Sequence, residues 1–306
     1  MAGADPIFVL APPFSGASLL AGVLDRHPQL AAVPELDLFM ADSVGELLEI
    51  FALGQDTHGQ GLLRALAEFE FGDQSDAGVA RAQTWLRARV QWSSAVLLQS
   101  LAAMVAPRRL VIPDTESPLR PSDLQRLRRA APDARVLQCL RHPYSVGVHH
   151  AAWLSDRLFV PIDFKDHGLP LPAIDPQLAW YRVHCNLERH LQAPGPLGEA
   201  PLPLLRVRIE DLEVSPQPCL RELCGWLELE ATPAALSAMQ APQDWVFAGY
   251  GPRAAPYGLD PDLLEEIRVP RAWPTTPTLE GPLPWRPDGA TFGGRLVQLA
   301  RDYGYC

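Results

Sequence analysis

Four short apolar runs along the chain predict buried β-strands. Each run is largely apolar at consecutive positions rather than at alternating ones, which is typical of strands covered on both faces. Because helices cover both faces of a parallel sheet, we interpret these runs as its inner strands. The runs are Ile7–Leu10, Leu110–Ile112, Val136–Leu140 and Leu204–Val207.

The segments between these runs carry apolar residues at helical spacing. One of the clearest follows Asp175, which suits an N-cap, and begins with Pro176, which suits the first helical position. The expected helices are Ser18–Asp25, Val44–Leu53, Gly61–Glu70, a helical stretch over Ala80–Val105, Ser122–Arg129, Pro176–Leu191, Cys219–Leu227, Asp260–Ile267 and Arg295–Tyr303.

This order of elements predicts an α/β fold with three layers, in which helices cover both faces of a central parallel sheet. We expect a single domain over residues 1–306, because no shift in composition marks a boundary. Helical patterns over approximately 41–106 predict an insertion between strands. Prolines cluster after residue 160 and predict an irregular arm over approximately 268–290, before the last helix.

Composition and charge limit the classes of partner. The formal net charge is −10, which argues against nucleic acid and against an anionic membrane surface as partners. No apolar stretch approaches the length that spans a membrane, and the N-terminus has no basic region before its apolar run, so we expect a cytoplasmic protein. The five cysteines lack a usual zinc spacing, so we expect free thiols and no metal site.

The first strand leads through a loop of small residues and prolines into a helix. This P-loop-like arrangement directs backbone N–H groups and a helix N-terminus at an anion. Gly16 permits a tight turn, and Ser18 offers a hydroxyl at the start of the helix. The loop contains no lysine or arginine. Because Lys165 is the only lysine of the chain, arginine or backbone N–H groups must hold any phosphate.

Arg141 follows another predicted inner strand, at the end where open α/β sheets bind ligands. Its guanidinium is suited to hold a phosphate through two hydrogen bonds. The alternative is a surface ion pair at the end of a strand. The Pro143 that follows favours the functional interpretation.

Two segments resemble the sulfotransferase family that uses 3′-phosphoadenosine 5′-phosphosulfate (PAPS). Pro6–Leu38, with Pro12-Pro13-Phe14-Ser15-Gly16-Ala17-Ser18, resembles the 5′-phosphosulfate loop, its helix and the acidic segment after it. Asp133–Val146, with Arg141-His142-Pro143, resembles the 3′-phosphate motif. Arg206–Leu212 and the ending Leu299–Tyr305 are supporting matches in the same order.

The resemblance implies PAPS as the cofactor and a set of residues that would bind it. These are Phe14, Ser15, Gly16, Ala17 and Ser18 for the 5′ end, with Arg141 and Arg253 for the 3′ phosphate. The sequence departs from the family at two of these positions, because Phe14 stands where a lysine or arginine is usual and Ala17 where a threonine or serine is usual. Phe14 cannot stabilise charge on a leaving phosphate.

Two residues are candidates for catalysis. Glu35 follows the first helix, where several members of the family carry the base that activates the acceptor, and a carboxylate there can take a proton from a hydroxyl. The alternative is a solvated acid beside Pro34. His149 stands where the family has a serine that binds the 3′ phosphate; its imidazole can bind phosphate, act as a base or pack. Either His149 or His150 should face the cleft.

The aromatic and glycine-rich segment Gln243–Gly258 is typical of a loop over a site, and Tyr257 within it is a candidate for lining an acceptor pocket. The first functional hypothesis is a sulfotransferase that moves a sulfonate from PAPS to a hydroxyl of a small molecule or of a natural-product intermediate tethered to a carrier protein. A second is acid–base catalysis on the same fold, such as cyclisation, elimination or hydrolysis. A third is a binding protein without catalysis, because fold alone does not fix function.

Overall fold

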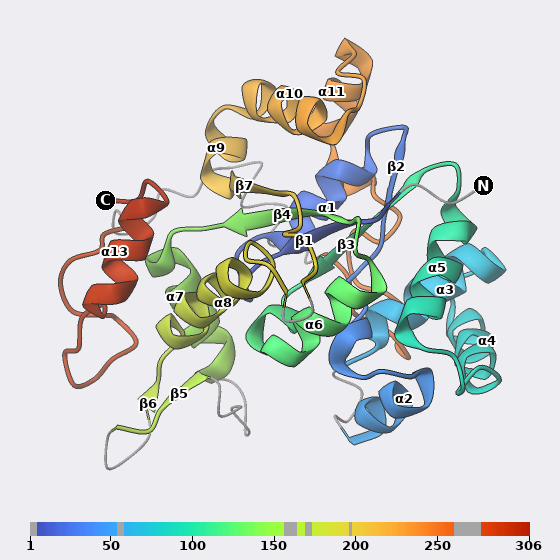
Figure 1. Cartoon of the computed structure of the whole chain (residues 1–306), viewed down its shortest axis with the longest axis horizontal. Helices are drawn as coiled ribbons and strands as arrows, with labels where there is room; N and C mark the ends of the chain where they lie inside the picture. Colours follow the sequence, from blue (N-terminus) through green and yellow to red (C-terminus); the bar gives the residue numbers. More distant parts are fainter. Residues whose placement is uncertain (1–4, 54–57, 156–163, 169–172, 196–197, 260–276) are drawn as a thin grey trace.

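The computed structural model describes residues 5–53, 58–155, 164–168, 173–195, 198–259 and 277–306. These residues form a five-stranded parallel sheet in the order β2-β3-β1-β4-β7. Helices lie on both of its faces (Figure 1), which confirms the expected three-layer α/β fold. The strands are β1 (Ile7–Leu10), β2 (Leu30–Ala32), β3 (Arg109–Asp114), β4 (Arg135–Leu140) and β7 (Leu204–Arg208).

The four apolar runs correspond to four of the five strands. The bounds of β1 agree with the prediction residue for residue, and every side chain in it is buried. It lies between β3 and β4, with Ile7 opposite both Val111 and Arg135. The strand β2 was not predicted, because three residues of the sequence Leu-Ala-Ala carry little β-propensity.

Helices from distant parts of the chain cover the sheet. On one face lie α1, α10 and α11, and on the other α5, α6 and α8 (Figure 1). Outside the insertion, the described residues form the helices α1 (Ala17–Asp25), α6 (Pro121–Ala130), α7 (Pro143–Ser155), α8 (Gln177–His190), α9 (Ile209–Val214), α10 (Pro216–Leu227), α11 (Pro233–Met239) and α13 (Gly294–Asp302). The helix expected at Asp260–Ile267 lies outside the described residues. In the part of the chain that is described, no helix is long and apolar enough to cross a membrane.

A helical insertion separates β2 from β3. It contains α2 (Val44–Leu53), α3 (Gln60–Phe71), α4 (Asp76–Arg87) and α5 (Ser94–Val105). The helical stretch expected over Ala80–Val105 is therefore two helices. Ser93 is the N-cap of the second helix, α5, because its hydroxyl accepts a hydrogen bond from Val96 N at 3.3 Å.

A cluster of charged groups joins the C-terminal arm to the segment before α8. Arg286 is only 8% exposed, and its guanidinium pairs with Asp175, with Asp166 at 3.0 Å and with Asp288 at 2.7 Å. Asp166 lies in β5 (Lys165–Asp166), which pairs antiparallel with β6 (Ala173–Ile174). The expectation that Asp175 is the N-cap of α8 is wrong, because its carboxylate is engaged by Arg286 and by Trp285 Nε1 at 3.3 Å.

We expect Arg286→Ala to lower the free energy of unfolding by about 3–5 kcal/mol, because it leaves the buried Asp175 carboxylate without its charged partner. Urea denaturation followed by circular dichroism measures this change. Arg301→Ala, at an exposed position on α13, is the matched control and should change stability by less than about 0.5 kcal/mol. An unchanged unfolding midpoint for Arg286→Ala would show that the ion pairs of Arg286 contribute nothing to stability.

Candidate functional site

The loop between β1 and α1 has the backbone geometry of an anion-binding turn. Phe14 and Gly16 adopt left-handed conformations, with φ values of 65° and 87°. A Cβ atom at Gly16 would lie 3.0 Å from Ile209 Cγ1, so the turn packs tightly against α9. No side chain caps α1, and the buried Ser15 hydroxyl has no hydrogen-bond partner among the described residues. N–H groups and a hydroxyl are therefore available at this turn.

Arg141 lies against this loop. It follows β4, its side chain is buried with 7% exposure, and its Nη1 donates a hydrogen bond to Phe14 O at 3.3 Å. Its own carbonyl oxygen accepts from Trp180 Nε1 at 3.0 Å, which fixes the backbone of the corner. The structure thus brings together the two segments that carry the resemblance.

The chain's C-terminal residues support the corner after Arg141. Glu210 Oε1 accepts from His142 N at 2.7 Å, and Glu210 Oε2 accepts from the Tyr305 hydroxyl at 3.1 Å. The rings of His142 and Tyr305 meet edge to face, with centroids 5.1 Å apart. Glu210 and Tyr305 belong to the two supporting matches, which therefore join each other at the corner.

Glu35 lies on the other side of the loop. It follows β2, and its Oε2 accepts a hydrogen bond from Thr115 Oγ1 at 2.9 Å, at the end of β3. Its Oε1 lies 3.5 Å from Ser18 Oγ in the first turn of α1. Burial raises the pKa of the Tyr257 hydroxyl, and the charge of Glu35 adds to the increase. A carboxyl group, the hydroxyls of Thr115 and Ser18 and the start of a helix therefore meet at one point.

Burial changes the proton affinity of the carboxyl groups here. Removal from water raises the pKa of Glu35 to about 8, and the nearby carboxyls of Asp37 and Asp114 add to the effect. Burial also raises the pKa of Asp114 to about 7, although hydrogen bonds from Ser117 oppose the increase. Glu35 is thus mostly protonated at pH 7 and becomes a carboxylate near pH 8, which suits a group that exchanges a proton with a hydroxyl.

Asp37, two residues after Glu35, is engaged by the helical insertion. Its Oδ2 accepts from Gly59 N at 3.3 Å and lies 3.2 Å from His58 Nδ1. The hydrogen bond to Asp37 raises the pKa of His58 above its usual value. Asp37 is therefore held by a histidine and a backbone N–H group next to Glu35.

The Phe14 ring packs against α7. Its centroid lies 5.0 Å from that of His150 and 5.7 Å from that of Trp153. His150 is 1% exposed, and burial lowers its pKa to about 4, so the imidazole that faces the loop is neutral. His149 is half-buried beside it on the same helix. His150 thus places its ring against a side chain of the loop.

Arg253 and Ala17 occupy different surroundings. Arg253 is exposed in a turn that the insertion anchors, because the next residue, Ala254, donates its N–H to Asp76 of α4 at 2.8 Å. In Figure 1, α4, which anchors this turn, lies at the right, well separated from the end of β4 at the left that leads to Arg141.

Ala17 is buried in the first turn of α1, where its methyl group joins the core.

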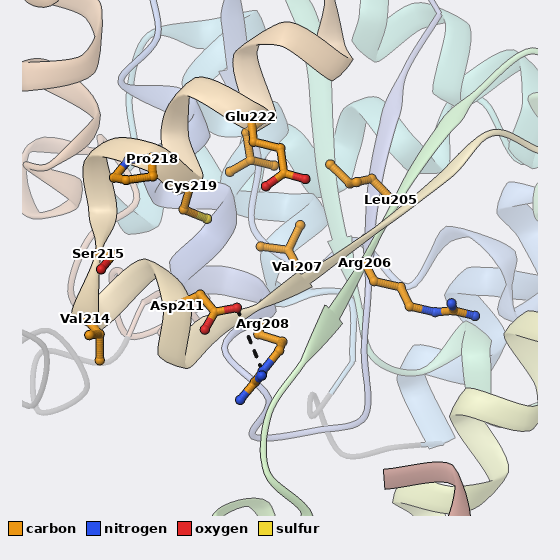
Figure 2. Close-up of a pocket in the computed structure, with 11 residues that line it drawn as sticks. Leu205, Arg206, Val207, Arg208, Asp211, Val214, Ser215, Pro218, Cys219 and Glu222 are labelled. Atoms are coloured by element: carbon orange, nitrogen blue, oxygen red, sulfur yellow. Dashed lines mark ion pairs between the residues drawn. The ribbon is translucent and has the colours of Figure 1, made fainter. Parts of the chain in front are cut away.

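Two hollows on the described surface lie apart from the loop. One, with a volume of about 240 Å³, follows the outer edge of β7 beside α9 and α10 (Figure 2), where Arg208 and Asp211 form an ion pair at 3.9 Å. The other lies at the amino ends of β3 and β4, where Arg109 and Arg135 bind carbonyl groups at the C-terminal end of α10. None of the candidate site residues lines either hollow.

Comparisons with known proteins identify the family and the fold. Residues 6–233 match the model of the sulfotransferase family. The chain is similar to a sulfotransferase domain from the curacin biosynthetic pathway, with a TM-score of 0.69 and 23% identity over 100% of this chain and 99% of that one. It is also similar to a sulfotransferase domain from the Synechococcus PCC 7002 olefin synthase, with a TM-score of 0.66 and 21% identity over 99% and 96% of the two chains. A search of curated proteins finds no match.

The raised pKa of Glu35 has a consequence for stability. The folded protein keeps this proton up to about pH 8, whereas the unfolded chain releases it near the ordinary value of 4.5. Stability therefore falls as the pH rises between these values. We expect the melting temperature of Glu35→Gln to increase relative to that of the wild type as the pH rises from 5 to 9.

Differential scanning calorimetry at several pH values measures this gain. Glu49→Gln, at an exposed position on α2, is the control and should follow the wild type at every pH. A difference between Glu35→Gln and the wild type that stays constant with pH would contradict a raised pKa at Glu35.

Proposed function

The chain belongs to the sulfotransferase family, and from that premise we propose that it transfers a sulfonate from PAPS to a hydroxyl group of a biosynthetic intermediate. The acceptor is a small molecule or an intermediate tethered to a carrier protein. The observation that carries the proposal is the convergence on one loop of Arg141 from one side and Glu35 from the other.

The loop offers a fit for the phosphate groups of the donor. Ser15 brings a buried hydroxyl without a partner among the described residues, and the uncapped start of α1 brings N–H groups and the positive end of the helix dipole. Arg141 adds a guanidinium at 3.3 Å from the loop backbone, suited to the 3′ phosphate. In this assignment Phe14 and Ala17 line the loop without contributing charge.

Glu35 is assigned the role of the base. In the transfer, the acceptor oxygen forms a bond to sulfur, the bond from sulfur to the 5′-phosphate oxygen breaks, and the acceptor proton moves to the carboxylate. Because the Thr115 hydroxyl donates a hydrogen bond to Glu35, the carboxyl group keeps its orientation toward Ser18. His149 keeps its assignment as a further candidate from α7.

The similar proteins support one class of acceptor. Both similar structures are sulfotransferase domains from biosynthetic systems, an olefin synthase and the curacin pathway. This supports a biosynthetic intermediate as the acceptor of this chain.

A second function is favoured by one observation. Phe14 replaces the usual cation of the loop with an aromatic ring that packs on His150 and Trp153. A loop of this kind has less charge to offer a leaving phosphate. In the alternative, the site performs acid–base chemistry through Glu35 without a sulfonate donor, or binds a ligand without transforming it.

Binding of 3′-phosphoadenosine 5′-phosphate (PAP) tests the donor site. We expect the wild type to bind PAP in isothermal titration calorimetry and Arg141→Ala to bind it about 10- to 100-fold more weakly, the loss typical of a hydrogen bond to a charged group. Arg189→Ala, at an exposed position on α8, is the control. Arg253→Ala in the same series tests the second arginine.

Transfer itself is measured with PAPS labelled with sulfur-35 and a panel of hydroxylated acyl thioesters. No binding of PAP at millimolar concentration would exclude the sulfotransferase and favour acid–base chemistry. Binding that depends on Arg141 without transfer to any acceptor would favour a binding protein.

Phe14 gives a second, independent test. We expect Phe14→Arg to tighten PAP binding by about tenfold or more, because it restores a guanidinium at the loop. Phe14→Leu, which removes the ring without adding charge, is the matched control and should bind PAP like the wild type. Weaker binding by both variants would mean that the packing of Phe14 on α7 shapes the loop.

A further inference from the structure

The peptide group between Arg141 and His142 is held at both of its polar atoms. Its carbonyl oxygen accepts a hydrogen bond from Trp180 Nε1 at 3.0 Å, and its N–H group donates to Glu210 Oε1 at 2.7 Å. Because the C=O and N–H of a trans peptide point in opposite directions, α8 holds this group from one side and α9 from the other. The plane of the peptide group is therefore fixed relative to these two helices.

The fixed peptide group sets the direction in which the Arg141 side chain leaves the backbone. The strand before it is fixed as well, because β4 pairs with β7 up to Leu140, which lies opposite Arg208. With the backbone held on both sides, the two dihedral angles of Arg141 are determined. Its buried side chain then reaches the loop between β1 and α1, where Nη1 donates to Phe14 O at 3.3 Å.

We propose that Trp180 and Glu210 are positioning residues, which hold the Arg141 guanidinium beside the anion-binding loop without touching the ligand themselves. This inference rests on the proposed function, in which Arg141 binds the 3′ phosphate of the donor. It adds two residues to the donor site that lie on α8 and α9, outside the two segments that form the loop and the corner.

Trp180 is supported by a chain of buried polar groups. The indole is 1% exposed, and the His184 ring meets it edge to face with centroids 4.4 Å apart. His184 Nδ1 lies 2.9 Å from Gln138 Nε2 of β4, which also donates to the Tyr303 hydroxyl at 3.3 Å. That hydroxyl donates to Glu188 Oε1 at 2.9 Å. The indole is therefore packed against groups that connect α8, β4 and the end of α13.

Glu210 uses both of its carboxyl oxygens. Oε1 accepts from His142 N, and Oε2 accepts from the Tyr305 hydroxyl at 3.1 Å. The Tyr305 ring also lies under the Arg208 guanidinium, 4.6 Å from its centroid, and packs on the His142 ring. An amide has only one acceptor oxygen, so a glutamine at position 210 could not satisfy both donors.

The variant Glu210→Gln gives the sharpest test, because charge and position predict opposite results. Removing a negative group near a phosphate site should tighten binding of PAP if charge alone matters. We expect the reverse, a dissociation constant for PAP about three- to tenfold higher in isothermal titration calorimetry, the loss typical of one hydrogen bond. The KM for PAPS should rise by a similar factor, with kcat within about twofold of the wild type.

Glu222→Gln, at an exposed position on α10, is the matched control and should bind PAP like the wild type. Tighter or unchanged binding of PAP by Glu210→Gln would overturn the assignment of Glu210.

Trp180→Phe keeps an aromatic ring and removes the N–H donor. We expect PAP to bind about three- to tenfold more weakly here as well. Trp85→Phe, which loses the indole hydrogen bond to Glu70 Oε1 in the insertion, is the matched control. Because Trp180→Phe also removes volume from the core, Glu210→Gln, which keeps the size of the side chain, separates loss of position from loss of packing.

A double-mutant cycle tests whether both residues act through Arg141. In Arg141→Ala, neither Glu210→Gln nor Trp180→Phe should weaken PAP binding by more than about a further twofold, because the group that they position is gone. Equal losses in the two backgrounds would show a general effect on the fold and would overturn the inference.

NMR relaxation of the arginine Nε–H groups gives a readout without any nucleotide. With the Arg141 signal assigned by its loss in Arg141→Ala, we expect its order parameter to fall by about 0.2 in Glu210→Gln and in Trp180→Phe, the difference between rigid and flexible groups, and to stay unchanged in the two controls. If the wild type binds no PAP and the order parameter still falls, the positioning role stands and the donor assignment falls. If PAP binds through Arg141 and neither the order parameter nor the affinity changes, the donor assignment stands and the positioning role falls.

Discussion

The candidate site depends on the partial burial of the Glu35 carboxyl group beside the loop between β1 and α1. Because burial keeps a proton on this group at neutral pH, the carboxyl is uncharged beside the place where phosphates would sit. A carboxylate at the same place would repel an anionic donor through a medium of low dielectric constant. The same group lies close enough to ionisation to accept a proton, so one environment would serve both the proposed binding and the proposed chemistry.

Long-range contacts decide the geometry on both sides of the loop. On one side, Glu210 links His142 to Tyr305, so residues separated by more than 150 positions set the corner that carries Arg141. On the other side, Glu35 accepts a hydrogen bond from Thr115 at the end of β3 and lies beside Ser18 in the first turn of α1. Parallel sheets gather strand ends at one edge, which is why such distant residues meet.

Local signals predicted much of this arrangement. Apolar runs indicated four of the five strands, and the sequences around Gly16 and Arg141 indicated which strand ends would carry the site. The Thr115 hydroxyl could not be predicted as a partner of Glu35, because the two residues lie 80 positions apart and no periodic pattern relates them. The Asp175 cap was predicted from local sequence alone and was wrong, because Arg286 competes for the same carboxylate from another part of the chain.

The guanidinium of Arg64 joins the helical insertion to the loop of residues 243–258. It binds Gly249 and Tyr257 through their carbonyl oxygens, so it holds the loop by its backbone whatever side chains the loop carries. A chimera that carries this loop into a relative would keep the loop's conformation only if the graft also brought the first two turns of α3. Grafts of the loop should therefore move both segments together.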